Sequence, residues 1–282
     1  MTAEARQQEF PYTDTDFKQI KGILYDEAGI FLPSTKMSLV YSRLTKRLRA
    51  LGLKSFYEYV LYVQGSGAKS ERRQLVNALT TNLTHFFREP HHLDTVTNVL
   101  GPEAVQATSS GRSYRIWSAG CSTGEEPYSV ALALLRHAPE LAQRDVHILA
   151  TDIDSDVVDH AKRGAYEKHI VRPVESGLLS KYFETGWGPN ADRYVVRDTL
   201  RSMTTFKTLN LMQHWPMSGQ FDAVFCRNVV IYFDEATKAV LWQRFASAIK
   251  PGGHLMIGHS ERIAGPAREM FEPAGLTTYR RR

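Results

Sequence analysis

Cysteine is scarce in this chain of 282 residues, and long hydrophobic runs are absent. The two cysteines, Cys121 and Cys226, exclude a disulfide framework and a cysteine-based metal cluster, and we interpret both as small buried thiols. No apolar run approaches the roughly 20 residues that cross a membrane, and the polar start from Met1 to Pro11 lacks the core of a signal peptide. We therefore expect a cytoplasmic protein without membrane insertion.

The histidine pair of this chain is a poor candidate for a metal centre. His91 and His92 are adjacent, and adjacent side chains on a helix point about 100° apart. Joint ligation by such a pair has poor geometry, so we expect no metal.

Acidic residues are also absent between Glu27 and Glu58, a stretch that contains six basic residues. At about 100° per residue one face of the helix expected here is apolar, formed by Met37, Val40, Tyr41, Leu44, Leu48 and Leu51. The opposite face is basic, formed by Lys36, Arg43, Lys46, Arg47 and Arg49. Unrelieved like charge destabilises a helix and favours an acidic partner, although a solvated face is the plainer alternative. Phosphate contacts are a further alternative, but no aromatic platform is interleaved with these residues.

Helix signals surround this basic segment. Thr13 and Asp14 can cap a first helix that ends near Gly29, and Gly52 closes the basic helix. Ser55 and Glu58 form a capping-box pattern, and another helix is indicated from Glu71 to Leu79. Residues 1–80 therefore form a small helical domain, followed at 81–113 by a polar, aromatic segment and a linker rich in Ser, Thr and Gly from Ala104 to Ser113.

A glycine turn lies at the centre of the remaining chain. Tyr114 to Trp117 is typical of a buried strand, and the apolar run from Glu126 to Leu135 indicates a helix, so Gly120 and Gly124 lie between strand and helix. Without Cβ atoms these glycines would let a ligand approach, and free N–H groups at the helix start would face it. The spacing is Gly-x-x-x-Gly, which does not match the dinucleotide pattern.

An acid follows one strand–helix unit later. Val146 to Ala150 is expected to form the second strand, and Asp152 stands at its tip, where doubly wound sheets bind ribose hydroxyls. The pair of features favours a nucleoside-bearing ligand. A tight turn with a helix-capping aspartate is the structural alternative.

The rest of the chain alternates strands and helices, which predicts an α/β domain at 114–282 with a mainly parallel sheet. Residues 166–206 break this rhythm, and the turn residues from Gly186 to Asn190 indicate an inserted hairpin. Pro251 to Gly253 is expected to form a turn, and the segment from Gly275 to Tyr279 a final edge strand.

Five motifs together resemble the CheR family, the S-adenosylmethionine-dependent protein-glutamate O-methyltransferases that modify chemotaxis receptors. The motifs span Thr81 to Glu89, Ala119 to Tyr128, Ala150 to Asp154, Cys226 to Phe233 and Gly258 to Glu261. The resemblance implies a doubly wound, seven-stranded methyltransferase sheet, an all-helical N-terminal domain and an antiparallel β-subdomain within the insert.

The resemblance also implies the site. The cofactor S-adenosylmethionine, which becomes S-adenosylhomocysteine, would be bound by Asn82, Thr84, Arg88, Glu125, Asp152, Asn210, Leu211, Arg227 and Asn228. Arg88 and Tyr232 would lie nearest the transferred methyl group and are the implied catalytic residues.

The implied partners are the acidic methylation helices of chemotaxis receptors, which would meet Arg43, Lys46, Arg47 and Arg49. In some members the β-subdomain grips a receptor C-terminal peptide, and for this chain that contact stays open. The expected function is methylation of receptor glutamates, with no nucleic-acid partner. The alternatives are a cofactor-binding docking module without turnover, and an RNA or small-molecule methyltransferase.

Overall fold

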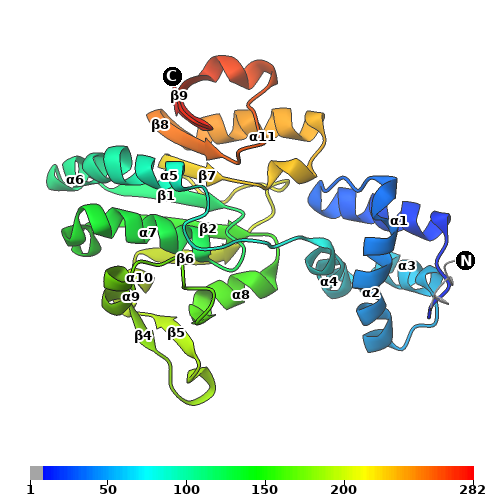
Figure 1. Ribbon diagram of the computed structural model, residues 1–282. Coiled ribbons are helices and arrows are strands. Elements are labelled where there is room, and N and C mark those ends of the chain that lie inside the picture. Colours follow the sequence, from blue (N-terminus) through cyan, green and yellow to red (C-terminus); the bar gives the residue numbers. More distant parts are fainter. Residues whose placement is uncertain (1–8) are drawn as a thin grey trace, which may run out of the picture. The chain divides into compact units, whose positions relative to one another are not determined.

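The computed structural model describes residues 9–282, so most of the polar start, Met1 to Gln8, lies outside the described residues (Figure 1). The chain forms two compact units, Met1–Thr81 and Asn82–Arg282. Within residues 9–282, no helix has both the length and the apolar character that spanning a membrane requires.

The first unit is all-helical, as the sequence predicts. Its elements are α1 Asp14–Ala28, the 3-10 turn η1 Ser34–Lys36, α2 Met37–Leu51, α3 Phe56–Gln64 and α4 Lys69–Leu79. Thr13 caps α1 through a capping box with Asp16, and Gly29 ends that helix in the left-handed conformation. Ser55 accepts the N–H of Glu58 at 3.2 Å, whereas the Glu58 carboxylate accepts the N–H of Lys54 at 2.8 Å. Half of the predicted capping box therefore forms.

The second unit is built on a seven-stranded sheet, which confirms the predicted fold class. The strands lie in the order β6-β2-β1-β7-β8-β10-β9. Their bounds are β1 Tyr114–Ala119, β2 Val146–Asp152, β6 Thr204–Thr208, β7 Phe221–Cys226, β8 Ile249–Ile257, β9 Phe271–Gly275 and β10 Thr278–Arg281. Strands β6, β2, β1, β7 and β8 pair in parallel, and β10 runs antiparallel to both of its neighbours.

Two local expectations at the end of the sheet are wrong. The chain closes as a hairpin in which β10 lies inside the sheet and β9 forms the edge, so the last segment is not the edge strand. Pro251–Gly253 does not separate two elements, because β8 continues through it with a shift of register opposite Phe221 and Ala223. Gly253 packs on the Asp222 carbonyl, where a Cβ would come within 2.7 Å of the oxygen.

Helices cover both faces of the sheet. The main ones are α6 Gly101–Ser109, α7 Glu125–His137, α8 Ser155–Arg163 and α11 Glu235–Ala248. Neighbouring residues of β1 show the two layers: Ile116 belongs to the core that also contains Leu132 of α7, whereas the Trp117 ring lies 5.4 Å from that of Phe245 in α11. The strand order reverses beside β1, so right-handed crossovers put the helices before and after the reversal on opposite faces.

The linker expected from Ala104 to Ser113 is helical as far as Ser109, because α6 extends through most of it. Pro90 opens α5 Pro90–Thr95, and a π-helical turn, η2 Val96–Leu100, joins it to α6. The apolar side chains of this helical run, Leu93, Val96, Leu100 and Ala104, are buried in the main core, which explains why its polar composition was misleading.

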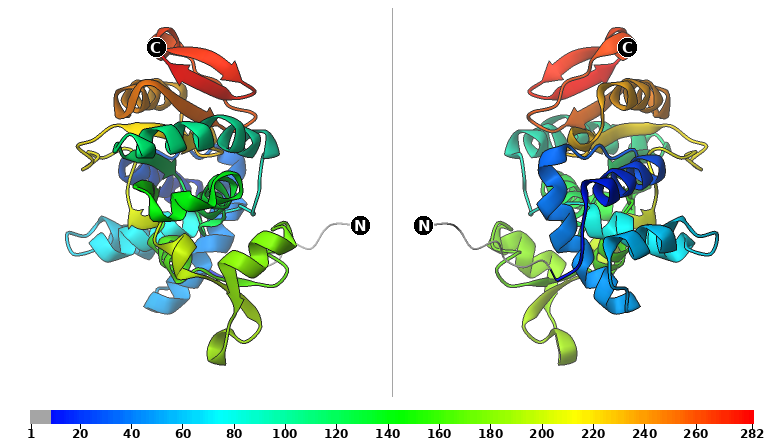
Figure 2. Two further views of the ribbon diagram at one scale, coloured as in Figure 1. Left: turned by 90° about the vertical axis from the view of Figure 1, so that its left-hand side faces the viewer. Right: turned by 90° about the vertical axis from the view of Figure 1, so that its right-hand side faces the viewer.

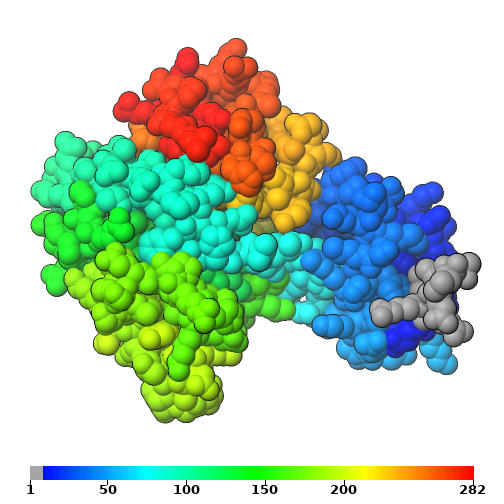
Figure 3. Space-filling view, viewed as in Figure 1, coloured from blue at the N-terminus to red at the C-terminus, as the bar shows by residue number. Residues whose placement is uncertain are grey.

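The insert forms its own three-stranded antiparallel sheet, as predicted. The order is β3-β5-β4, with β3 Ala165–Glu167, β4 Phe183–Thr185 and β5 Arg193–Val196, and α9 Ser176–Tyr182 lies between β3 and β4. The short α10 Asp198–Arg201 leads from β5 back to β6. The hairpin between β4 and β5 projects away from the main sheet (Figures 2 and 3). Trp187 near its tip is 81% exposed.

Candidate functional site

The loops after β1 and β7 meet where the strand order reverses, which is the place where doubly wound sheets bind ligands. Gly120 follows β1 with φ +95°, and a Cβ there would collide with Val229 in the loop after β7. Glycine is therefore required at this position both by the backbone conformation and by the close approach of the second loop.

The glycine loop does not offer its N–H groups to a ligand as freely as the sequence suggests. The N–H groups of Gly120 and Cys121 both donate to the Thr151 carbonyl, at 2.7 and 2.9 Å, and that of Gly124 donates to the Cys121 carbonyl at 3.0 Å. A Cβ at Gly124 would lie 2.8 Å from Cβ of Ala161 in α8. These glycines thus make room for neighbouring protein segments, a role that the sequence pattern did not indicate.

Asp152 joins the end of β2 to this loop. Its Oδ2 accepts the N–H of Ser122 at 2.8 Å, and its Oδ1 accepts the N–H of Asp154 at 3.0 Å. Burial raises the pKa of Asp152 to about 6, although the backbone N–H groups act in the opposite direction. A carboxylate can accept about four hydrogen bonds, so acceptor capacity remains for the hydroxyl groups of a ribose.

Glu125 is the first residue of α7 and is almost fully buried. The Thr123 hydroxyl donates to its Oε2 at 2.6 Å. Burial raises the pKa of Glu125, and the Thr123 hydrogen bond opposes that shift. A second buried acid, at the start of the helix after the glycine loop, suits the hydroxyl and ammonium groups of an S-adenosylmethionine-like ligand, which would supply the donors that these acids accept.

The segment from Asn82 to Glu89, called the roof segment here, begins beside these acids. Asn82 donates from Nδ2 to Asp154 Oδ2 at 2.7 Å, and its carbonyl accepts the Ser122 hydroxyl at 2.8 Å. Thr84 is half-buried in the same segment. The start of the roof segment is therefore tied to the loops after both β1 and β2.

The end of the roof segment is strained. Phe87 and Glu89 have φ of 57° and 55°, so left-handed residues stand on both sides of Arg88. Such a conformation costs a non-glycine residue roughly 1–3 kcal/mol. The Phe87 N–H donates to Ser129 Oγ at 2.9 Å, and the half-buried Arg88 donates from Nη1 to the Leu83 carbonyl at 2.9 Å. Surrounding contacts must hold this backbone in place.

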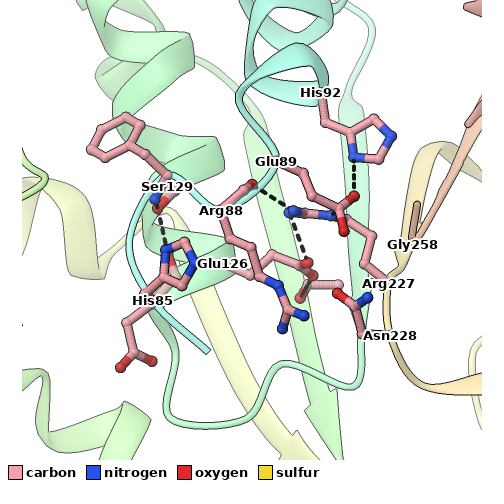
Figure 4. Close-up of polar contacts among 12 residues, drawn as sticks. His85, Arg88, Glu89, His92, Glu126, Ser129, Arg227, Asn228 and Gly258 are labelled. Carbon is pink, nitrogen blue, oxygen red and sulfur yellow. Dashed lines mark hydrogen bonds and ion pairs between the residues drawn. The ribbon is translucent and has the colours of Figure 1, made fainter. Parts of the chain in front are cut away.

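Arg227, after β7, supplies much of that support (Figure 4). Its guanidinium is 3% exposed and donates to Glu126 Oε2 at 3.2 Å, Glu89 Oε2 at 3.4 Å and the Arg88 carbonyl at 2.5 Å. Glu126 also accepts the Ser118 hydroxyl at 2.7 Å. The guanidinium of Arg227 is thus committed to protein acceptors. Sequence reasoning did not assign roles to Glu89 and Glu126, although both lie within the motifs.

The loop after β6 carries Asn210 and Leu211. The Leu209 N–H donates to the Asp152 carbonyl at 2.8 Å, which brings this loop beside the end of β2. Asn210 Oδ1 accepts the N–H of Met212 at 2.9 Å. The Leu211 carbonyl accepts hydrogen bonds from Trp215 and from Arg244 of α11. The structure therefore brings this loop together with Asp152.

Asn228 and Tyr232 lie in the segment after β7. Asn228 has φ of 59°, and its N–H donates to Glu261 Oε2 at 3.3 Å. Glu261 is a buried acid that also accepts the N–H of Gly258 at 2.5 Å, and burial raises its pKa. Tyr232 is half-buried and ends a 3-10 turn, η5 Val230–Tyr232. Glu261 stands in the last of the five motifs but was given no role from sequence.

His91 and His92 lie closer together than their helix positions suggest. Their ring centroids are 4.1 Å apart, and each ring places Nε2 near Thr277 Oγ1, at 3.2 and 3.0 Å. With Glu89 they form a group whose ligand-type atoms lie within 4.8 Å of one another. The expectation that the rings diverge is wrong, because both rings converge on the Thr277 hydroxyl. Arg227 already supplies a positive charge beside Glu89.

Cys121 and Cys226 are both buried and unbridged, as expected. Burial raises the pKa of each thiol well above its usual value. Both thiols therefore stay protonated and pack as small apolar groups.

The basic face of α2 is partly neutralised within the first unit, so the expectation of unrelieved like charge is wrong. Arg47 pairs with the buried Glu71 at 2.6 Å, and Arg49 pairs with Glu9. Arg43 donates to the carbonyls of residues 78–80 at the end of α4. The pairing acids lie far away in sequence, outside the stretch that lacks acidic residues. Lys46 remains exposed.

Comparison with known families gives the same division of the chain. Residues 82–280 match the family model described as CheR methyltransferase, SAM binding domain, and residues 15–80 match CheR methyltransferase, all-alpha domain. The first match covers every predicted cofactor-binding residue. The predicted cofactor, S-adenosylmethionine, is thereby confirmed.

Three bacterial proteins illustrate the similarity. A Rhizobium etli protein named "Probable chemotaxis protein methyltransferase" is 46% identical over 92% of this chain and 96% of its own length. "Chemotaxis protein methyltransferase 2" of Pseudomonas aeruginosa is 41% identical over 96% of this chain and 95% of its own. "Chemotaxis protein methyltransferase" of Escherichia coli is 39% identical over 95% and 91%.

Solved structures resemble this chain only distantly. The glycopeptide N-methyltransferase MtfA is 14% identical, with a TM-score of 0.33 over 60% of each chain. The sequence relationships are far stronger, and they extend through both units. On this evidence the chain belongs to the CheR methyltransferase family.

Proposed function

We propose that the protein transfers the methyl group of S-adenosylmethionine to glutamate side chains of chemotaxis receptors, in the cytoplasm, and so forms γ-methyl esters. Three relatives named as chemotaxis methyltransferases support this substrate. The observation that carries the proposal is the convergence of Asp152 and the roof segment, which holds Arg88, at the sheet edge matched by the family's S-adenosylmethionine-binding model.

The acids and amides at this edge would hold the cofactor. Asp152 and Glu125 are suited to the ribose hydroxyls and the ammonium group, and Asn82, Asn210 and Asn228 to further hydrogen bonds. Thr84, Arg88, Leu211 and Arg227 complete the proposed set, and Arg227 would contribute by holding the roof segment, because its guanidinium is committed to protein acceptors. When bound, S-adenosylmethionine supplies a methyl group made electrophilic by its sulfonium.

The acceptor needs no general base, because a glutamate side chain is ionised near neutral pH. Arg88 can hold a carboxylate through paired hydrogen bonds, and the Tyr232 hydroxyl can orient the acceptor oxygen. The reacting groups carry opposite charges that disappear during transfer, so exclusion of water by the roof segment favours the reaction. Alignment of the acceptor supplies up to about 7–11 kcal/mol of the barrier.

The exposed basic residues of the first unit would face an acidic receptor helix. Lys46 is the clearest candidate, and Arg49, Arg43 and Arg47 add positive charge although they have partners within the unit.

The β-subdomain offers a second contact. A surface hollow of about 510 Å³ there is lined by Lys168, His169, Arg172 and Arg193, together with Glu167, Asp192 and Pro189, and its basic side chains suit an acidic receptor peptide.

Incubation of the purified full-length protein with methyl-labelled S-adenosylmethionine and receptor fragments tests the proposal. We expect labelled receptor from which mild base releases the label, as esters require. Alkali-stable label would contradict ester formation. Cofactor binding without transfer would indicate a docking module, and salt-dependent binding and labelling of RNA would indicate a nucleic-acid methyltransferase.

Two variants test the proposed catalytic residues. We expect Arg88→Ala and Tyr232→Phe to lower kcat by about 10²-fold or more, the scale for losing a positioning or charge-stabilising group. Unchanged receptor methylation in both variants would remove these roles.

A further inference from the structure

We propose that Glu89 is a positioning residue for the transfer, which acts through Arg227 on Arg88 and does not touch the reacting atoms. This inference rests on the proposed role of Arg88. Glu89 directly follows Arg88 in the chain, but its carboxylate faces the protein interior and is 10% exposed.

Glu89 joins segments that are far apart in sequence. Its Oε2 lies 3.3 Å from His92 Nδ1 in α5 and 3.4 Å from Arg227 Nε after β7. Its Oε1 lies 3.4 Å from the N–H and 3.5 Å from Nδ1 of His259, after β8. The carboxylate therefore connects the end of the roof segment with the loops that follow two strands of the main sheet.

Arg227 links Glu89 to Arg88 through hydrogen bonds. It donates from Nε to Glu89 and from Nη2 to the Arg88 carbonyl, so one rigid guanidinium holds two successive residues (Figure 4). A lysine could not reproduce this fork. Both neighbours of Arg88 are in the left-handed conformation, which persists only where surrounding contacts impose it. Loss of the Glu89 charge would weaken the contact that fixes this backbone.

The charges around Glu89 agree with this role. Burial alone would raise the pKa of Glu89, but the His92 ring, whose Nδ1 lies 3.3 Å away, and the positive charge of Arg227 outweigh it and hold the pKa well below the usual range. The group is ionised at any pH at which the protein is used. Arg227 faces one further carboxylate, Glu126. Substitution of Glu89 therefore leaves the guanidinium paired with Glu126 alone, and we expect it to shift toward that residue.

A double-mutant cycle on the full-length protein tests the inference. We expect Glu89→Gln to lower kcat for receptor methylation by about 10- to 100-fold, as for a catalytic group displaced by about 1 Å. The Kd for S-adenosylhomocysteine should change no more than it does in Arg88→Ala, because Glu89 affects the cofactor only through its neighbours. Since Glu89 acts through Arg88, the double variant Arg88→Ala/Glu89→Gln should be no more than about twofold slower than Arg88→Ala.

Independent, multiplicative losses in that cycle would overturn the inference, and so would an unchanged kcat in folded Glu89→Gln. Glu103→Gln is the matched control. Glu103 accepts the Tyr114 hydroxyl at 2.9 Å and pairs with His254 at 3.1 Å, at the start of β1, away from the loops of the site. We expect it to lower the melting temperature and leave kcat unchanged.

Two further results keep the test decisive. If Glu89→Gln does not fold, Arg227→Lys replaces it, and an unaltered kcat in that variant would contradict the inference because lysine cannot hold both residues. If the wild-type protein transfers no methyl group to receptors, the proposed function itself fails. That outcome is distinguishable from a failed cycle, in which the wild type is active.

Discussion

Asp152 accepts the backbone N–H of Ser122 at 2.8 Å, and this bond ties the end of β2 to the loop after β1. Asp152 therefore supports the glycine loop, in addition to its proposed role as a ribose ligand. The buried carboxylate is costly in its ionised form, and burial raises its pKa to about 6 from an ordinary value of 3.8. Folding and cofactor binding should therefore respond in opposite ways to pH.

The first prediction concerns this pH dependence. Because the folded-state pKa is raised, the folded protein binds the proton more tightly than the unfolded chain between about pH 4 and pH 6, so the contribution of Asp152 to stability falls by about 3 kcal/mol as the pH rises through this window. Cofactor affinity should rise through the same window, because ionised Asp152 is the better acceptor. Thermal melting and calorimetric titration from pH 4 to pH 8 measure both trends.

Asp152→Asn is the control for that titration. We expect it to bind the cofactor more weakly than the wild type above pH 6, and to show both trends reduced by the share that Asp152 contributes. A wild-type protein whose cofactor affinity is constant between pH 5 and pH 7 would argue against Asp152 as a ligand.

Much of this architecture follows from local sequence signals. Hydrophobic runs ending at Gly120 and at Asp152 placed the two strands and their loops, and Gly29 and Gly52 ended the helices as predicted. These features depend on short-range backbone preferences, which the sequence records directly. The resemblance supplied the number of strands, which spacing alone did not give.

The missed features depend on partners that are distant in sequence. Arg47 pairs with Glu71, 24 residues away, and Arg227 pairs with Glu89 across 138 residues. No local pattern indicates such pairs. The convergence of the rings of His91 and His92 on Thr277 depends in turn on the hairpin that closes the sheet, which lies 185 residues further along the chain. The same holds for the glycine loop, whose N–H acceptor Thr151 belongs to another strand.

A second prediction concerns Gly120→Ala. The backbone there has φ +95°, and the added Cβ would collide with Val229, so strain and overpacking add to a loss of about 2–4 kcal/mol in the free energy of unfolding. Denaturant titration measures it. Gly111→Ala is the control, because Gly111 has φ +71° and open space around its Cβ position, so it bears the strain without the collision and should lose only about 1–2 kcal/mol.

The double variant Gly120→Ala/Val229→Ala separates the two causes. Removal of the valine methyl groups relieves the collision and should recover part of the loss, whereas the backbone strain stays. Equal destabilisation by Gly120→Ala and Gly111→Ala would show that the contact between the two loops is unimportant.

A third prediction concerns Arg244 of α11, which holds the loop that carries Asn210 and Leu211. Arg244 donates to the carbonyls of Leu211 and Gln213, and its guanidinium lies 4.0 Å from the centre of the Trp215 ring. We expect Arg244→Ala to lower the free energy of unfolding by about 1–3 kcal/mol. The loosened loop should weaken cofactor binding by about three- to tenfold, and calorimetry measures that change.

Lys238→Ala is the matched control on the same helix. Lys238 pairs with the exposed Glu235, one turn away, and such a pair contributes about 0–1 kcal/mol. Cofactor binding should be unchanged in this variant. An equal loss of affinity in both variants would point to α11 as a whole, and would leave no special role for the Arg244 contacts.

The last prediction separates the partner-facing charges of α2 from its structural ones. Lys46 is exposed, so Lys46→Glu should leave the melting temperature within about 2 °C and lower kcat/KM for receptor several-fold, an effect that shrinks with added salt. Arg47→Ala should behave in the opposite way, because it leaves the buried Glu71 without its charged partner and should cost about 2–4 kcal/mol of stability. Its cofactor affinity should be unaffected, since Glu71 and Arg47 belong to the first unit.

Receptor kinetics at two salt concentrations, together with thermal melts of both variants, compare the two effects. If Lys46→Glu methylates receptors as well as the wild type at low salt, an acidic receptor helix does not dock on this face of α2.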